Sequence, residues 1–170
     1  MICLSSARFN RSLKTLPATV SLPGLAMDTQ IEATGAVLLA DDDSNDIFFL
    51  RRAFQRAGFE NTVLDVPDGE KAIEYLCGDN HFSDRKRYPI PTLLILDLKM
   101  PKINGFEVLE WLKTRNDLRG LKVVVLSSSG LASDQQKARA LGAHDYRVKP
   151  ADLEDMVNMI KEVAGRWLQA

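Results

Sequence analysis

The chain contains few of the residues that build disulfide frameworks or histidine-rich metal centres. Its 170 residues include only two cysteines and two histidines. Cys3 and Cys77 lie far apart and form no C-x-x-C pair, so we interpret them as free thiols of a reducing compartment. His81 and His144 are isolated from each other, and we expect both at the surface or in turns. The composition therefore argues against a disulfide-stapled fold and a zinc-type site.

Long apolar runs and a strong net charge are also missing. No apolar run approaches the roughly 18 residues that a membrane-spanning helix requires. The net charge of −1 gives no reason to expect general binding to nucleic acid or to a membrane surface. Hydrophobic residues make up 45% and charged residues 26%, which is ordinary for a soluble chain that buries a core. We expect one domain with a tail, located in the cytoplasm.

The first part of the chain lacks both acidic residues and a clear hydrophobic period. No acid occurs before Asp28, and polar and basic residues such as Arg11 interrupt the 7–15-residue apolar core that an export signal needs. Composition alone fits an organellar transit peptide weakly. We expect residues 1–34 to be a disordered extension, or partly the result of a start codon assigned too early, with Met27 as the true start. Residues 35–170 form the predicted domain.

From residue 36 onwards, apolar runs of strand length alternate with helical patterns. The predicted strands are 37–40, 62–66, 93–96, 122–126 and 145–148, and the predicted helices are about 47–57, 70–76, 106–115, 133–141 and 153–167. A long polar connection, 78–91, precedes the third strand. This alternation predicts an α/β fold, with a doubly wound parallel sheet and helices on both faces. We expect the flavodoxin-like strand order 2-1-3-4-5, which is taken from known folds of this class.

Local signals predict where the helices begin and end. Ser44 or Asp46 can cap the first helix, and Gly58 can end it in a left-handed conformation. Ser133-Asp134-Gln135-Gln136 has the form of a capping box for the fourth helix.

A lone carboxylate follows the most continuous apolar run of the chain. Leu93 to Leu96 reads as a strand buried on both faces, and Asp97 stands where that strand would emerge. Pro101 and Gly105 then prevent a smooth passage into a helix. Asp97 is either an ordinary turn residue or a reactive group at the edge of an open α/β sheet, where ligands collect.

Polar residues at the other strand ends favour the reactive alternative. Asp41 and Asp42 follow the first strand, Ser127 ends the fourth, and Lys149 follows the fifth. Parallel strands bring these ends to one edge, where clustered carboxylates repel one another unless a hard cation such as Mg²⁺ joins them. A lysine ammonium and a serine hydroxyl suit phosphoryl oxygens. An aspartate such as Asp97 can act as the nucleophile of phosphoryl transfer.

The same stretches resemble the receiver domain of two-component response regulators. The matching segments are Val37-Leu38-Leu39-Ala40-Asp41-Asp42-Asp43, Leu96-Asp97-Leu98-Lys99-Met100-Pro101 with Asn104-Gly105, Val125-Leu126-Ser127-Ser128, and Tyr146-Arg147-Val148-Lys149-Pro150. The resemblance implies that Asp97 accepts a phosphoryl group from the phosphohistidine of a sensor kinase.

The resemblance also implies roles for the surrounding residues. Asp42 and Asp97 would bind Mg²⁺ directly, Asp41 mainly through water, and Lys99 through its backbone carbonyl. Ser127 and Tyr146 would form the switch pair, in which the hydroxyl moves to the phosphoryl group and the ring turns inward. Lys149 and Pro150 would be joined by a cis peptide bond. Lys99 and Ser129 occupy two positions that tune phosphoryl lifetime in the family, so the resemblance implies no particular lifetime for a phosphoryl group on Asp97.

The resemblance also implies which proteins this chain binds. The long 78–91 connection is similar to that of single-domain regulators that partner phytochrome-type kinases. The last helix uses nearly all residues after Pro150, so we expect no DNA-binding output domain. The phosphodonor would be a sensor histidine kinase or a phosphotransfer protein, and the output would be contact with a protein target. The family's usual contact face, about 133–168 here, could also support a homodimer.

Two other functions fit parts of the sequence. Asp41-x-Asp43 after the first strand is superficially similar to the nucleophile and acid of haloacid-dehalogenase-like phosphohydrolases, but Asp97 then has no role. A pseudo-receiver would act as a scaffold without phosphorylation, although every acidic and basic position of the motif is intact. We expect a signalling phosphoacceptor that is not an enzyme beyond assisting its own phosphorylation and dephosphorylation.

Overall fold

The computed structural model describes residues 35–168, so the expected extension 1–34 and the alternative start at Met27 lie outside the described residues. The elements run in the order β1 (Ala36–Ala40), α1 (Ser44–Ala57), β2 (Val63–Val66), α2 (Gly69–Cys77), η1 (Asn80–Ser83), β3 (Pro91–Leu96), α3 (Gly105–Lys113), η2 (Asn116–Leu118), β4 (Lys122–Ser127), α4 (Ala132–Ala140), β5 (Asp145–Val148) and α5 (Leu153–Trp167). Among these helices, none has both the length and the apolar character needed to cross a membrane.

The strands form one parallel sheet in the order β2-β1-β3-β4-β5, which confirms the predicted topology. β1 and β3 are neighbours at the point where the strand order reverses, and Ala40 pairs with Leu96 in their register. The residues that directly follow β1 and β3 therefore lie next to each other at the edge of the sheet. These residues are Asp41 and Asp97.

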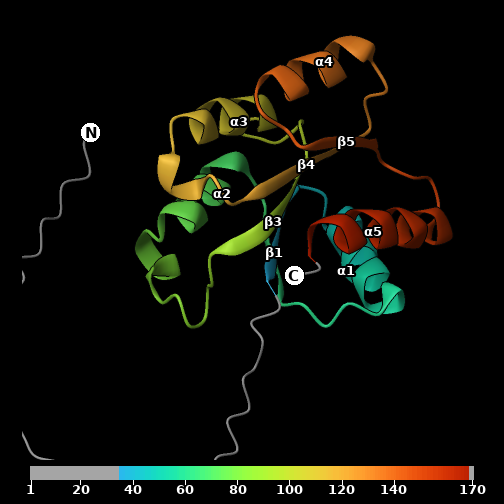
Figure 1. The fold of residues 1–170 in the computed structure, drawn as a ribbon, viewed down its shortest axis with the longest axis horizontal. Coiled ribbons are helices and arrows are strands. Elements are labelled where there is room, and N and C mark those ends of the chain that lie inside the picture. Colours follow the sequence, from blue (N-terminus) through green and yellow to red (C-terminus); the bar gives the residue numbers. More distant parts are fainter. Residues whose placement is uncertain (1–34, 169–170) are drawn as a thin grey trace, which may run out of the picture. The chain divides into compact units, whose positions relative to one another are not determined.

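Helices cover both faces of the sheet, with α1 and α5 on one face and α2, α3 and α4 on the other (Figure 1). Alternate residues of β3 serve the two cores: Leu93 and Ile95 pack with α1 and α5, while Leu94 and Leu96 pack with α2 and α3. Because side chains on a strand point to opposite faces in turn, a strand covered on both sides needs the unbroken apolar run seen in the sequence.

The N-cap of α1 is Asp43, so the predicted cap at Ser44 or Asp46 was wrong. The Asp43 carboxylate accepts a hydrogen bond of 2.8 Å from the backbone N–H of Asn45. The helix starts earlier than the apolar pattern indicated, and this leaves Asp46 in the first turn with its side chain free for another partner. Gly58 does end the helix in the left-handed region, with φ of 82°.

The capping box predicted for α4 was also wrong. The helix begins at Ala132, and its N-cap, Leu131, supplies no side-chain hydrogen bond. Asp134 instead accepts a hydrogen bond of 2.5 Å from the hydroxyl of Ser129 in the preceding loop. Because the helix begins one residue before Ser133, that serine lies inside the first turn and cannot be the N-cap. The Asp134 side chain ties the β4–α4 loop to the helix.

The 78–91 connection is more ordered than its polar composition suggested. Phe82 is buried, and its ring lies 5.0 Å from that of Tyr75 and 5.2 Å from that of Tyr88, measured between centroids. Arg85 donates hydrogen bonds to the backbone carbonyls of Tyr75 and Leu76 at the end of α2. The last carbonyls of a helix lack the full set of intrahelical partners. The Tyr75 carbonyl also accepts from the N–H of Gly78, and Arg85 adds a charged donor to both carbonyls, which stabilises the junction.

Candidate functional site

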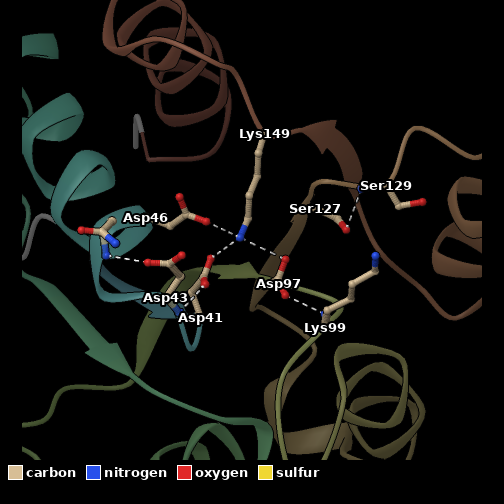
Figure 2. Close-up of polar contacts among 9 residues, drawn as sticks. Asp41, Asp43, Asp46, Asp97, Lys99, Ser127, Ser129 and Lys149 are labelled. Carbon is tan, nitrogen blue, oxygen red and sulfur yellow. Dashed lines mark hydrogen bonds and ion pairs between the residues drawn. The ribbon is translucent and has the colours of Figure 1, made fainter.

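Asp97 lies at the carboxyl end of β3 with both oxygens engaged. Asp97 is only 4% exposed. Its backbone N–H donates a hydrogen bond of 2.9 Å to the carbonyl of Ala40, which fixes Asp97 against β1. Oδ1 lies 3.2 Å from Nζ of Lys149, and Oδ2 accepts a hydrogen bond of 2.6 Å from the backbone N–H of Lys99. The strand pairing and the following loop therefore hold this carboxylate at the sheet edge (Figure 2).

Three carboxylates meet at this edge. One oxygen each from Asp41, Asp42 and Asp97 can be chosen so that all lie within 4.8 Å of one another. Asp41 and Asp97 are buried, whereas Asp42 is exposed. Carboxylate oxygens are the ligands that hard divalent cations prefer, and one exposed member leaves access from solvent. The donor set and spacing therefore fit a single Mg²⁺-type cation.

Lys149 brings a positive charge into the same group. Its Nζ lies 2.8 Å from Oδ2 of Asp41 and 3.2 Å from Oδ1 of Asp97. A third carboxylate, Asp46 of α1, lies nearest at 2.6 Å (Figure 2). The Lys149 side chain is 15% exposed, so these ion pairs form largely away from solvent.

Burial and the neighbouring charges shift the pKa values of Asp41 and Lys149. Burial raises the pKa of Asp41 above its usual value, although hydrogen bonds from Lys149 and from the amide of Asp43 act in the opposite direction. Burial by itself would lower the pKa of Lys149, but hydrogen bonds to Asp41 and Asp46 and the nearby charge of Asp97 raise it above its usual value. Lys149 is therefore a fixed cation at neutral pH.

Ser127, at the end of β4, lies beside Asp97 on the neighbouring strand (Figure 2). It is fully buried, and its Oγ accepts a hydrogen bond of 3.2 Å from the backbone N–H of Ser129. Tyr146 of β5 is also buried, and its hydroxyl donates to the backbone carbonyl of Ser129 at 2.8 Å. Ser129 thus contacts both members of the expected switch pair.

The structure brings together the residues predicted from the strand ends and adds Asp46 and Ser129 to them. Asp41, Asp42, Asp97 and Lys149 form one cluster, and Ser127 lies next to it. Sequence reasoning treated Asp46 only as a potential helix cap and gave Ser129 no structural role.

The peptide bond between Lys149 and Pro150 is trans, as are all others among residues 35–168, so the expected cis bond is not found. The two isomers of an X-Pro bond differ by only about 0.5–1 kcal/mol, so the sequence motif alone does not fix the choice.

The geometry speaks against the phosphohydrolase alternative. Asp43 would have to act as a general acid, yet its carboxylate caps α1. The hydrogen bond from the amide of Asn45 lowers the pKa of Asp43 below its usual value, which favours the ionised form that cannot donate a proton. Asp41, the corresponding nucleophile, has one oxygen on Lys149 and the other on the amide of Asp43.

Comparisons with known proteins agree with this geometry. The family model described as the response regulator receiver domain matches residues 37–161. Among solved structures, response regulator RPA3017, in red light signaling of R. palustris, is 35% identical with a TM-score of 0.75, covering 79% of this chain and 94% of that one. The phosphorylated cyanobacterial phytochrome response regulator RcpA is 30% identical with a TM-score of 0.74, covering 81% and 96% respectively.

A third similar structure is the Mn²⁺-bound form of response regulator Rcp1, a protein of Synechocystis. It is 27% identical with a TM-score of 0.70, covering 80% of this chain and 96% of that one. The family model spans most of the described domain, and all three structures align over nearly their full length. The chain therefore belongs to the response regulator receiver domain family.

Proposed function

We propose that Asp97 is the phosphoacceptor of this receiver and takes a phosphoryl group from a phosphohistidine. The observation that carries the proposal is its position: a buried carboxylate at the sheet edge, 3.2 Å from the Lys149 ammonium and within reach of two further carboxylates. Phosphoryl transfer depends mainly on positioning and on charge stabilisation, and this arrangement supplies both.

Phosphoryl transfer to Asp97 replaces one P–N bond with one P–O bond. A carboxylate oxygen of Asp97 forms a bond to phosphorus, the P–N bond of the phosphohistidine breaks, and its electron pair stays on the imidazole nitrogen, which takes a proton from solvent. The product is an acyl phosphate on Asp97. Lys149 stabilises the charge on the phosphoryl oxygens, and the Ser127 hydroxyl donates to another of them.

We assign the cation site to the acidic group and choose Mg²⁺ as the ion. Asp42 and Asp97 would bind it directly, Asp41 through water, and Lys99 through its backbone carbonyl. When bound, the cation neutralises charge on the carboxylates and phosphoryl oxygens. Supporting observations are the 4.8 Å grouping of three carboxylates and the Mn²⁺ found in the structure of Rcp1.

We assign the switch to Ser127 and Tyr146. When the Ser127 hydroxyl turns to the phosphoryl group, its hydrogen bond from the amide of Ser129 is lost. Because Ser129 also accepts from Tyr146 and donates to Asp134, the change reaches β5 and the first turn of α4. The output is then a changed contact face formed by α4, β5 and α5.

The partners follow from this chemistry. The phosphodonor is a sensor histidine kinase or a phosphotransfer protein, and the resemblance to RPA3017 and RcpA favours a phytochrome-type kinase. The output partner is a protein or a second copy of the chain, bound at about 133–168. Leu131 and Val148, which are 63% and 47% exposed, offer apolar contacts beside and within this region. We place the chain in the cytoplasm, where ATP is available to phosphorylate histidine kinases. We assign it no catalytic activity beyond assisting its own phosphorylation and dephosphorylation.

The test is phosphorylation by a small phosphodonor. The protein is incubated with acetyl phosphate and Mg²⁺, and its intact mass is followed. We expect one added phosphoryl group that is stable in acid, labile in base and absent from Asp97→Asn. An adduct that survives Asp97→Asn, or no adduct on the wild-type protein, would contradict the proposal. Turnover of p-nitrophenyl phosphate that depends on Asp41 but not on Asp97 would instead support the phosphohydrolase.

A further inference from the structure

Lys149 and Asp46 form the shortest of the ion pairs at the site. Asp46 Oδ2 lies 2.6 Å from Nζ, compared with 2.8 Å for Asp41 and 3.2 Å for Asp97. Asp46 comes from the first turn of α1, and in Figure 2 it approaches Nζ from the side opposite Asp97. A helix on one face of the sheet therefore contacts a lysine that follows β5, the last strand of the sheet.

The Lys149 ammonium has as many N–H donors as it has carboxylate partners. A lysine ammonium has three N–H groups, and here three carboxylates surround it: Asp41, Asp46 and Asp97. Asp41 and Asp97 also belong to the group of carboxylates that suits a cation, whereas Asp46 does not. A cation would draw on the charge of the first two carboxylates and leave Asp46 as the partner whose charge acts on Lys149 alone.

We propose that Asp46 is a positioning residue for phosphoryl transfer, which holds the Lys149 ammonium beside Asp97 while a cation and the incoming phosphoryl group engage the other carboxylates. The inference rests on the proposed role of Asp97 as phosphoacceptor. It adds a residue of α1 to a site otherwise built from strand ends and the loops that follow them.

Two observations separate this role from a purely local one. Asp46 is not needed as the helix cap, because Asp43 fills that position. Its side chain is 31% exposed and that of Lys149 is 15% exposed, so the pair is less screened than a surface ion pair. An acid in the first turn also interacts favourably with the helix dipole, so the test has to distinguish that effect on stability from an effect on Lys149.

The experiment measures the rate constant of phosphorylation by acetyl phosphate with Mg²⁺. We expect Asp46→Ala to lower it about tenfold, because Lys149 then samples positions away from Asp97. Asp46→Asn keeps an acceptor oxygen without the charge and should fall between Asp46→Ala and wild type. Glu70→Ala removes an exposed first-turn acid from α2, where the carboxylate pairs with Lys102 rather than with Lys149, and should leave the rate unchanged.

A double-mutant cycle with Lys149→Met identifies the route of the effect. If Asp46 acts through Lys149, then Asp46→Ala should cause no further loss in the Lys149→Met background. Where that background reacts too slowly to measure, the ¹⁵N signal of the Lys149 ammonium gives an independent readout. We expect it to be observable in the wild-type protein and broadened or shifted in Asp46→Ala.

A wild-type rate for Asp46→Ala, an equal loss in the Lys149→Met background, or an unchanged ammonium signal would overturn the role of Asp46 and leave Asp97 as the acceptor. Failure of the wild-type protein to gain a phosphoryl group on Asp97 would overturn the proposed function and this inference with it.

Discussion

The hydroxyl of Tyr146 donates a hydrogen bond of 2.8 Å to the backbone carbonyl of Ser129. Ser129 in turn donates its N–H to the hydroxyl of Ser127 and its own hydroxyl to Asp134. One residue of the β4–α4 loop therefore connects the end of β4 to β5 and to the first turn of α4. This connection gives the expected switch pair a physical path, because a change at Ser127 alters a hydrogen bond of the residue that holds Tyr146.

Removing the hydroxyl in Tyr146→Phe should weaken this connection without touching Asp97. We expect the free energy of unfolding to fall by about 0.5–1.5 kcal/mol, the usual net value of one hydrogen bond. Urea unfolding measures this loss, and acetyl phosphate measures phosphorylation, which should continue at nearly the wild-type rate. A severe loss of phosphorylation in a folded Tyr146→Phe protein would show that the hydroxyl acts on the acceptor itself.

Asp42→Asn should weaken binding of Mg²⁺. The exposed Asp42 carboxylate belongs to the three-carboxylate group and is the one most accessible to a hydrated ion. In calorimetric titration, we expect the dissociation constant of the Asp42→Asn protein for Mg²⁺ to be roughly tenfold higher or more than that of the wild type, equivalent to about 1.4 kcal/mol. Asp43→Asn makes the same change of charge one residue away and keeps a good helix cap, so it is the matched control. Equal weakening by both variants would reduce the effect to general electrostatics. Removal of Mg²⁺ by EDTA should stop phosphorylation reversibly.

Arg85→Ala should destabilise the domain because Arg85 links the 78–91 connection to the end of α2. Its guanidinium donates to the carbonyls of Tyr75 and Leu76 at 2.8 and 2.9 Å. We expect a loss of about 1–3 kcal/mol in the free energy of unfolding, measured with urea. The nearby Arg87 is exposed, and Arg87→Ala should change stability by no more than about 0.5 kcal/mol. Equal effects of the two substitutions would remove the special role of Arg85.

Asp68→Asn should make stability less dependent on pH in the acid range. Burial tends to raise the pKa of Asp68, but hydrogen bonds from Lys102 and from the amide of Lys71 hold it below its usual value. The carboxylate therefore stabilises the fold above its unfolded pKa of about 4, and this contribution is lost as pH falls through the lower folded value. We expect Asp68→Asn to be roughly 1 kcal/mol less stable at pH 7, with the gap closing below pH 4.

Glu70→Gln is the control for that measurement. Glu70 also contacts Lys102, at 3.1 Å, but its side chain is half exposed, so its effect should be smaller. A gap between Asp68→Asn and wild type that stays constant down to pH 2 would show that charge is not the cause.

The sequence was most informative where topology alone determines position. Asp41, Asp97 and Lys149 could be placed together because each directly follows a strand, and parallel strands bring such residues to one edge. The buried strands could also be recognised, because a sheet covered on both faces requires continuous apolar runs such as 93–96.

Asp46 could not be placed in the same way. Whether a first-turn side chain reaches Lys149 depends on where the helix begins and how it is rotated about its axis, and the apolar pattern placed that start too late. The α4 capping box failed because the helix begins at Ala132, which places Ser133 inside the first turn instead of at the N-cap. The aromatic cluster of Tyr75, Phe82 and Tyr88 was missed because Phe82 and Tyr88 are separated within a polar stretch and Tyr75 belongs to the preceding helix.

The central claim, that Asp97 carries the phosphoryl group, is tested most directly by trapping the acyl phosphate. The wild-type protein is phosphorylated with acetyl phosphate and Mg²⁺, then reduced with borohydride, which converts an aspartyl phosphate to homoserine. Peptide mass spectrometry locates the changed residue. We expect homoserine at position 97 and nowhere else. Homoserine at position 41, 42 or 43 with an unmodified Asp97 would contradict the assignment of the acceptor.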